Sequence, residues 1–346
     1  MASLCTFVQC SSSQPVFDED EWLKQVKATD SALLHAPHLN PDGTFFNPWL
    51  ERSRQRGRGS WFWSRLFGQK EKFDSFPEAE YSCVPNDYTY LSDPAFNSIT
   101  FAGHASMIIK MDSQTIFTDP FFSNAALIRR KKVKIKFDFS QVPEKLVVLI
   151  SHNHYDHLDK YSVKKLIKKD AVFVVPLGLK QFFIGLGARE VHELDWWENV
   201  SLGPLTYTLL PAQHWSRRIG QSGGKTLWGG FLIEGSKTVY FSGDTGYFKG
   251  FEEYGKRYNI DYALLGAGAY EPRWFMHYSH MNMAEFFRAV DELGAKTAIP
   301  LHLGIISLSD EPLLYPLYEA AKFINLHPEY SQRIYPLRVG EIIKIE

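Results

Sequence analysis

The sequence has little cysteine, no long hydrophobic run, and no excess of charge of either sign. Its three cysteines, Cys5, Cys10 and Cys83, are too few and too scattered for a disulfide framework or a thiolate zinc site, which favours a reducing compartment. Nowhere do about 18 apolar residues run together, and no basic segment followed by a continuous apolar one opens the chain. We therefore expect an intracellular, cytosolic protein with no secretion signal and no membrane span.

The charges nearly cancel, because 38 lysines and arginines face 39 aspartates and glutamates. A protein that binds nucleic acid along its surface usually has a broad basic field, so we expect no nucleic-acid partner. With 346 residues, of which 45% are hydrophobic, the chain is long and apolar enough to bury a sizeable core. It should be a globular protein.

The chain divides into two parts by composition. Residues 1–95 contain few strand-length apolar runs and form an expected amino-terminal extension, whereas 96–346 hold many short β-type runs bounded by Gly, Pro, Asn or Asp. Helices are expected at 159–170, 178–187 and 282–294. Early hairpins followed by alternating strands and helices predict an α/β domain with two sheets and helices outside them.

Metal-type side chains fall at the carboxyl ends of four separate apolar runs. In sheet-based folds the loops at one end of the strands converge, so residues far apart in sequence can meet there. The residues concerned are His152, His154, Asp156 and His157 after "VVLI", His214 after "YTLLPAQ", Asp244 after "TVYFSG" and His302 after "TAIPL".

The residue types indicate a centre with two metal ions. Zinc binds neutral imidazole nitrogen and carboxylate oxygen, and a catalytic site keeps one position for water. Two ions about 3.5 to 4 Å apart can lower the pKa of a bridging water and stabilise charge on a reacting oxygen. We expect Asp244 to bridge two ligand groups, one of His152, His154 and His214, the other of Asp156, His157 and His302.

Other polar residues carry weaker signals. Asp119, in "IFTDP", is either an acceptor for the second N–H of a ligand histidine or part of an ordinary Asp-Pro turn. The G-x-S-x-G match at 220–224 follows an arginine-rich stretch instead of a buried strand, so it predicts a loop. The segment "HELDW" at 192–196 has a tryptophan where a zinc-protease motif needs its second histidine. Neither segment is assigned to a site.

The pattern H-x-H-x-D-H, with His214, Asp244 and His302 in this order, resembles the metallo-β-lactamase superfamily, whose fold is an αββα sandwich with the site at the sheet edges. The segments "ELDWWE", "QHWSRR", "SGDTGY" and "GAYEPRWFMHYSHM" are similar, more specifically, to the N-acylphosphatidylethanolamine-hydrolysing phospholipases D. This similarity runs from about residue 45 onwards.

The resemblance implies a phosphodiesterase that cleaves N-acylphosphatidylethanolamine to N-acylethanolamine and phosphatidic acid, using water activated by two zinc ions. It gives Asp156 and Asp244 as catalytic metal ligands, and it gives His280 as an active-site residue near the scissile phosphate. From the residues alone, His280 could equally be a surface residue before a helix. Ser279, His277 and the run 303–312 depart from the family pattern, which leaves the acyl and headgroup preference open.

Membrane contact is expected at residues 56–68, where aromatic and basic side chains alternate as at the headgroup boundary of an anionic bilayer. The alternative is a loop whose tryptophans fill the core. Arg217 and Arg218 are either ligands for lipid phosphate or solvated arginines after a turn. The resemblance also implies a possible homodimer. The side chains expected at the membrane are Arg58, Trp61, Phe62, Trp63 and Arg65.

Two other classes of function could use the same fold. Another hydrolase of the same fold, such as a lactonase or a phosphodiesterase, would act on a soluble substrate with the same metal ligands. A lipid-binding protein without activity would be expected to lose ligands, and all seven are present. The choice between the two enzymes depends on the family motifs and on the segment near residue 60, because the metal site is common to both.

Overall fold

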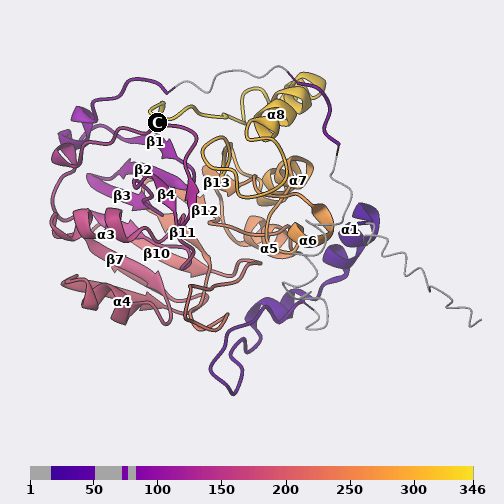
Figure 1. Cartoon of the computed structure of the whole chain (residues 1–346), viewed down its shortest axis with the longest axis horizontal. Coiled ribbons are helices and arrows are strands. Elements are labelled where there is room, and N and C mark those ends of the chain that lie inside the picture. Colours follow the sequence, from indigo (N-terminus) through magenta and orange to yellow (C-terminus); the bar gives the residue numbers. More distant parts are fainter. Residues whose placement is uncertain (1–16, 51–71, 77–82, 346) are drawn as a thin grey trace, which may run out of the picture.

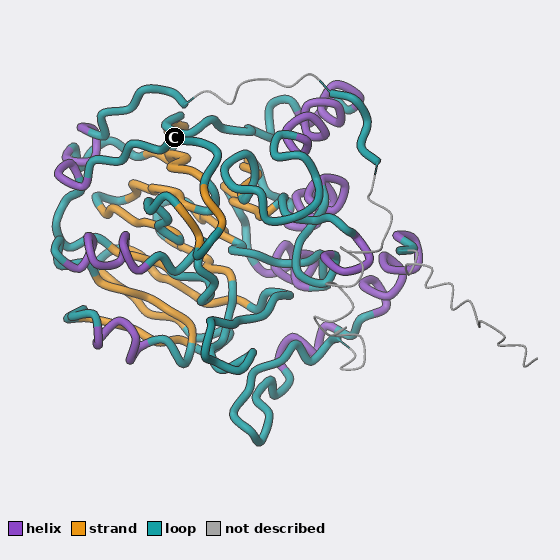
Figure 2. Tube along the Cα trace, viewed as in Figure 1, coloured by secondary structure: helices purple, strands orange, loops and turns teal. Residues whose placement is uncertain are grey.

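Two β-sheets face each other, and helices cover their outer sides (Figures 1 and 2). The computed structural model describes residues 17–50, 72–76 and 83–345. The expected membrane segment at 56–68 therefore lies outside the described residues. The layered arrangement confirms the predicted αββα sandwich.

The first sheet contains seven strands in the order β15-β1-β2-β3-β6-β7-β8. Its strands from β15 to β3 pair antiparallel, and those from β3 to β8 pair parallel. The bounds are β1 (Ser98–Gly103), β2 (Ser106–Met111), β3 (Gln114–Thr118), β6 (Val147–Leu149), β7 (Val172–Pro176), β8 (Glu190–Leu194) and β15 (Ile342–Lys344).

The second sheet contains six strands in the order β14-β13-β12-β11-β10-β9, with a parallel part from β12 to β14. The bounds are β9 (Asn199–Leu202), β10 (Leu205–Leu210), β11 (Gly230–Glu234), β12 (Thr238–Phe241), β13 (Tyr262–Gly266) and β14 (Thr297–Leu301). A separate short hairpin pairs β4 (Ala125–Ala126) with β5 (Arg129–Arg130).

The helices lie on opposite sides of the two sheets (Figure 1). Those on the first sheet are α3 (Lys160–Ile167) and α4 (Lys180–Gly185), and those on the second are α1 (Glu19–Ala28), α5 (Gly250–Arg257), α6 (Arg273–Met276), α7 (Met283–Leu293) and α8 (Tyr315–Leu326). Short 3-10 turns occur at Ser31–His35, Thr89–Ser92, Phe139–Gln141 and Pro328–Tyr330. Within the described part of the chain, no helix is long and apolar enough to cross a bilayer.

Alternating side chains explain why both faces of each sheet are buried. Met107 and Ile109 of β2 point into the core between the sheets, whereas Ile108 points towards α3 and α4. In the second sheet, Leu264 of β13 packs between the sheets and Leu265 packs under the helices. Successive residues of a strand face opposite sides, so apolar runs of this kind fit central strands.

The helices expected from the sequence correspond to α3, α4 and α7. Helix α7 starts at a capping box between Asn282 and Glu285 and ends at Gly294, whose φ of +60° is the left-handed value that glycine adopts without strain. Helices α1, α5, α6 and α8 were not expected from the sequence. Trp22 and Val26 of α1 are buried in the core under the second sheet, so part of the amino-terminal region packs on the α/β domain.

Candidate metal centre

The candidate metal centre lies where strands of both sheets end. The parallel strands of each sheet finish at the same edge, and the loops that follow them carry the polar side chains. These residues are His104 after β1, Asp119 after β3, His152, His154, Asp156 and His157 after β6, His214 after β10, Asp244 after β12 and His302 after β14.

One group brings together the ring nitrogens of His152, His154 and His214. His152 Nε2 lies 2.8 Å from His154 Nδ1, and His214 Nε2 lies 3.3 Å from the same atom. Ligands around tetrahedral zinc, with bonds of about 2.1 Å, are separated by roughly 3.4 Å. His154 Nε2, the nitrogen on the far side of its ring, is buried without a hydrogen-bond partner. The three converging nitrogens fit one metal ion.

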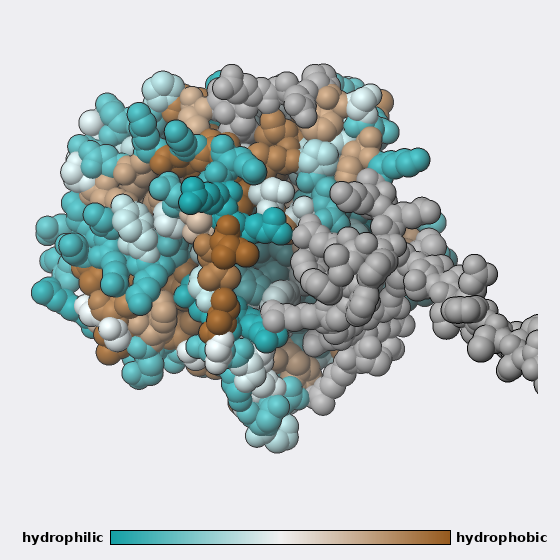
Figure 3. Space-filling view, in the orientation of Figure 1, coloured by the Kyte–Doolittle hydropathy of each residue, from teal (hydrophilic) through white to brown (hydrophobic). Residues whose placement is uncertain are grey.

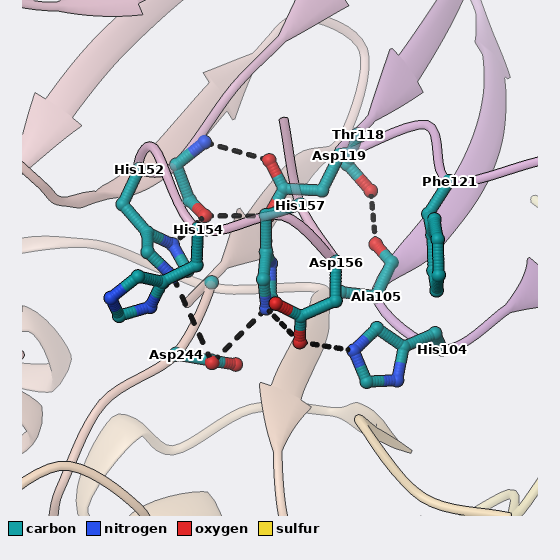
Figure 4. Close-up of polar contacts among 12 residues, drawn as sticks. His104, Ala105, Thr118, Asp119, Phe121, His152, His154, Asp156, His157 and Asp244 are labelled. Atoms are coloured by element: carbon teal, nitrogen blue, oxygen red, sulfur yellow. Dashed lines mark hydrogen bonds and ion pairs between the residues drawn. The ribbon is translucent and has the colours of Figure 1, made fainter. Parts of the chain in front are cut away.

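The second group contains Asp156, His157 and His302, and Asp244 lies between it and the first group. Asp244 Oδ2 is 3.1 Å from His157 Nε2 and 3.2 Å from His302 Nε2. The same oxygen is 3.9 Å from the Nε2 atoms of both His152 and His214. In Figure 4, dashed lines join the carboxylate of Asp244 to the rings of His157 and His152. This carboxylate is placed to contact ions in both groups.

Hydrogen bonds from behind hold the ligand side chains in position. Asp119 is fully buried and accepts from His157 Nδ1 at 2.7 Å, from the Ser151 backbone N–H at 2.7 Å and from the Ser151 hydroxyl at 2.5 Å. His214 Nδ1 donates to the Ser279 carbonyl at 3.1 Å. Such outer contacts select the tautomer of a ligand histidine and leave its other nitrogen free for a metal.

His104 is a member of the cluster that the sequence analysis missed. It is 1% exposed, its Nε2 donates to Asp156 Oδ2 at 2.9 Å, and its ring lies 4.0 Å from that of His302 (Figure 4). Burial lowers the pKa of His104 to about 3, so the imidazole is neutral. A signal was present, because His104 directly follows "SITFAG", an apolar run like those that precede the other ligands.

We expect His104→Asn to weaken metal binding by about 10- to 100-fold, the usual effect of losing a hydrogen bond to a ligand carboxylate. Asparagine tolerates the positive φ of +62° at this position but is too short to keep the contact with Asp156. Competition titration with a chromophoric chelator measures the affinity. His192→Ala is the control, since His192 lies on β8 and contacts Glu190. Equal affinity in the two variants would contradict the role of His104.

The electrostatics of the cluster fit a divalent cation. Burial lowers the pKa of His154 to about 4 and that of His214 to about 3, which keeps both in the neutral form that binds metal. Burial also opposes the charged form of His302, but the carboxylates of Asp244 and Asp156 outweigh it and raise the pKa to about 9. The two carboxylates therefore attract positive charge to this point, and a metal ion can take the place of the proton.

His280 lies beside the first group and is partly exposed. Its ring centroid is 5.3 Å from that of His214 and 5.4 Å from that of His302. His214, Asp244 and His280 also lie close enough together to bind one metal ion. Arg273 Nη1 donates to the His280 carbonyl at 3.0 Å, which fixes the loop after α6. The structure thus places His280 beside the cluster.

Ser279 and His277, two residues that depart from the family pattern, place no side chain in the metal cluster. Ser279 contributes its carbonyl oxygen to His214, a contact that does not depend on the side chain. His277 points towards α1, with its ring 4.7 Å from Trp22 and 4.5 Å from Phe17, and its Nδ1 contacts the Arg273 carbonyl. Neither substitution removes a member of the metal cluster.

The arginines that follow His214 differ in their contacts. The Arg218 guanidinium donates to the carbonyls of Asn153 and Leu158 and stacks on Tyr155, 4.3 Å from the ring centroid. These bonds hold the ligand loop between His152 and His157 in place. The Arg217 backbone N–H donates to Asn153 Oδ1, and its side chain is half-buried.

Comparison with known proteins identifies the family. The model of the Beta-lactamase superfamily domain matches residues 114–303. The chain is 31% identical over 239 residues to the mitochondrial N-acyl-phosphatidylethanolamine-hydrolyzing phospholipase D of Saccharomyces cerevisiae, covering 64% of this chain and 50% of that protein. It is 33% identical over 226 residues to N-acyl-phosphatidylethanolamine-hydrolyzing phospholipase D 1 of Caenorhabditis elegans, covering 59% of this chain and 63% of that protein.

A solved structure shares the fold. Igni18, a metallo hydrolase from Ignicoccus hospitalis, superposes with a TM-score of 0.55 at 20% identity, covering 73% of this chain and 99% of that one. The chain spans between half and two thirds of the length of the yeast and nematode relatives. With the family match over 114–303, the two facing sheets and the cluster at their edge, the chain belongs to the β-lactamase superfamily.

Proposed function

We propose that the protein is a metal-dependent hydrolase, and more narrowly a phospholipase D that cleaves N-acylphosphatidylethanolamine to N-acylethanolamine and phosphatidic acid. The single observation that carries the first part is Asp244, whose Oδ2 lies within 3.9 Å of ring nitrogens from both ligand groups. The identity of about a third to two phospholipases of this name supports the second part.

We propose two zinc ions as the cofactor. The nitrogen and oxygen donors are those that zinc prefers, and no thiolate is needed. When bound, the ions supply a water of lowered pKa and neutralise charge that develops on the phosphoryl oxygens. The proposed ligands are His152, His154 and His214 on one side, Asp156, His157 and His302 on the other, and Asp244 between them.

The protein's own side chains then orient the reaction. Asp119 accepts a hydrogen bond from His157, and His104 donates one to Asp156. These contacts keep the two proposed ligands in one arrangement while charge changes at the phosphorus. Burial lowers the pKa of His280 to about 3. It is therefore neutral and can donate one hydrogen bond to a phosphoryl oxygen or to the leaving oxygen. This geometry suits a phosphodiester, whose charge is spread over several oxygens.

The proposal includes an intracellular protein that works at a membrane surface, since its substrate is a phospholipid, and that can form a homodimer. The name of the yeast relative places that protein in mitochondria. The alternative is a hydrolase of the same fold that acts on a soluble lactone or phosphodiester. It predicts the same metal binding and differs only in the substrate, so activity measurements with several substrates separate the two.

The test is hydrolysis of N-acylphosphatidylethanolamine in mixed micelles by the purified, zinc-loaded chain. We expect zinc-dependent release of N-acylethanolamine and phosphatidic acid, measured by mass spectrometry. A chelator should remove the activity and added zinc should restore it. His152→Ala should be inactive because it loses one of the three ligands of the first group, whereas His192→Ala should keep the activity of the unchanged chain.

Two outcomes separate the parts of the proposal. Binding of two zinc ions without release of either product would keep the metal centre and contradict the phospholipid substrate. Lactones and soluble phosphodiesters would then be the next substrates. Release of products that persists after zinc removal and in His152→Ala would contradict the metal-dependent mechanism itself.

A further inference from the structure

Four large apolar side chains are exposed on two loops beside the metal centre. Leu127 and Ile128 form the turn between β4 and β5, with 52% and 84% of their surface exposed. Ile219 is 73% exposed and Trp215 is 41% exposed on the loop that follows His214. We call Leu127, Ile128, Trp215 and Ile219 the apolar rim. A single exposed residue of this kind is ordinary, but a group of four around a site marks an interaction surface.

Tyr155 links the two loops. Its ring packs with Phe121 and Ala126 at the base of the β4–β5 hairpin, and its hydroxyl accepts from the Ile219 backbone N–H at 3.3 Å. Both loops therefore lie on the same side of the ligand segment. Figure 3 shows, near the centre of the face drawn, hydrophobic residues along one edge of a hollow, with hydrophilic residues next to them.

The rim borders the metal centre itself. Trp215 follows His214 directly, and its ring centroid is 4.4 Å from that of His154. Tyr155 stands between His154 and Asp156 in the sequence. A molecule that rests on the rim is thus next to the ligands of both groups.

The turn residues are unusual for a two-residue hairpin. Ala126 pairs with Arg129, so Leu127 and Ile128 are the two central positions, and Leu127 has a φ of +56°. A positive φ at the first central position normally calls for glycine. Here a leucine adopts the positive φ although its side chain remains half exposed. Burial within the chain therefore does not offset the cost of this backbone conformation.

The surroundings of the rim are basic. The segments 121–136 and 215–225 contain no aspartate or glutamate. Arg129, Arg130 and Lys132 are exposed beside the hairpin turn. Exposed apolar side chains flanked by cations suit the headgroup boundary of a bilayer that contains anionic lipid. A second copy of this surface fits less well, because two basic hairpins would repel each other.

We propose that the apolar rim inserts into the surface of an anionic lipid bilayer, with the hairpin cations on the lipid headgroups, and so presents the metal centre directly to membrane lipid. This inference rests on the proposed phospholipid substrate. It assigns membrane contact to described residues that the sequence analysis did not consider for it. Bound in this way, the protein need not extract its substrate fully from the bilayer.

The test is sedimentation of the full, zinc-loaded chain with vesicles of phosphatidylcholine, with and without phosphatidylserine. The double variant Leu127→Asn/Ile128→Ser removes the apolar turn, and asparagine tolerates the positive φ at position 127. We expect its vesicle affinity to fall about tenfold on both lipid mixtures, since most of two large apolar side chains no longer enters the lipid. Leu326→Ser on α8, 69% exposed in the unchanged chain, should bind as before.

A second pair of variants tests the charges. Arg129→Ala/Arg130→Ala should weaken binding to the anionic vesicles by about fivefold for each arginine and leave phosphatidylcholine vesicles almost unaffected. Its control is Arg189→Ala. The Arg189 side chain is 84% exposed and pairs with Asp170, and both residues are remote in sequence from the hairpin. Unchanged vesicle affinity in both double variants, the one at Leu127 and Ile128 and the one at Arg129 and Arg130, would overturn the proposal. So would a loss of self-association in either variant, which would assign the rim to a second copy.

Hydrolysis separates this inference from the proposed function. If the rim variants lose vesicle binding and also cleave vesicle lipid more slowly, while soluble short-chain substrate is cleaved normally, both proposals are supported. If vesicle binding depends on the rim but no phospholipid is cleaved, the docking surface stands and the substrate assignment falls. Residues 56–68 are the same in every variant, so any contribution from them cancels.

Discussion

Asp244→Ala should lower hydrolysis by at least about a thousandfold, because one carboxylate oxygen serves both halves of the proposed metal centre. Its loss removes a ligand from each ion and leaves His157 and His302 without the charge that faces them at 3.1 and 3.2 Å. Metal ions usually contribute several kcal/mol to transition-state stabilisation, which corresponds to this factor. Steady-state kinetics and metal analysis of the same preparation measure the two losses together.

Two further variants define what Asp244 does. Asp244→Asn keeps the size of the side chain but loses its charge, so we expect it to bind less metal and to remain largely inactive. Asp170→Ala, which removes an exposed carboxylate that pairs with Arg189, should behave like the unchanged chain. Full metal content in Asp244→Ala, with two ions per chain, would show that this residue does not bridge the ligand groups.

Glu285→Ala should destabilise the fold by about 3 to 5 kcal/mol, since it leaves a buried charge without its partner. Arg273 Nη2 donates to both carboxylate oxygens of Glu285, at 2.8 and 2.7 Å, and the two side chains are 11% and 1% exposed. Glu285 also accepts from the Asn282 backbone N–H in the capping box of α7. Urea unfolding followed by circular dichroism gives the change in free energy.

An exposed ion pair supplies the control for Glu285. Lys296 Nζ contacts Asp261 Oδ1 at 2.7 Å and the lysine side chain is 72% exposed, so Lys296→Ala should change the free energy of unfolding far less than Glu285→Ala does. A comparable loss in the two variants would mean that the Arg273 pair is worth no more than a surface contact. Because Arg273 also holds the His280 carbonyl, we expect Glu285→Ala to lower activity before the protein unfolds.

The residues of the candidate metal cluster could be proposed from the sequence because their spacing and their position after apolar runs are local features. The four residues from His152 to His157 lie in one loop, and strand ends in such folds converge. His104 also follows an apolar run, but it was not predicted because no other histidine or aspartate stands near it at metal-ligand spacing. Its contact with Asp156 joins positions 52 apart in the sequence, and only the folded chain shows it.

The helices show a similar division. Helix α7 has a capping box and a terminal glycine, and both signals are local. Helix α1 lies in the amino-terminal part, where few strand-length apolar runs were found and no helix was expected, and it is held by the burial of Trp22 and Val26 against distant residues. The apolar rim could not be predicted either, because the sequence does not show which large apolar side chains the fold leaves exposed.

The order of the ligands along the chain determines when a metal can bind during synthesis. His104 is made first and His302 last, and the first ligand group stays incomplete until His214 has left the ribosome. The strand that closes the edge of the first sheet, β15, follows all of them. A centre that contains both ligand groups can therefore form only after His302 has been made. Since the two groups come from loops of both sheets, a metal that binds them together would stabilise the chain only after the sheets have come together.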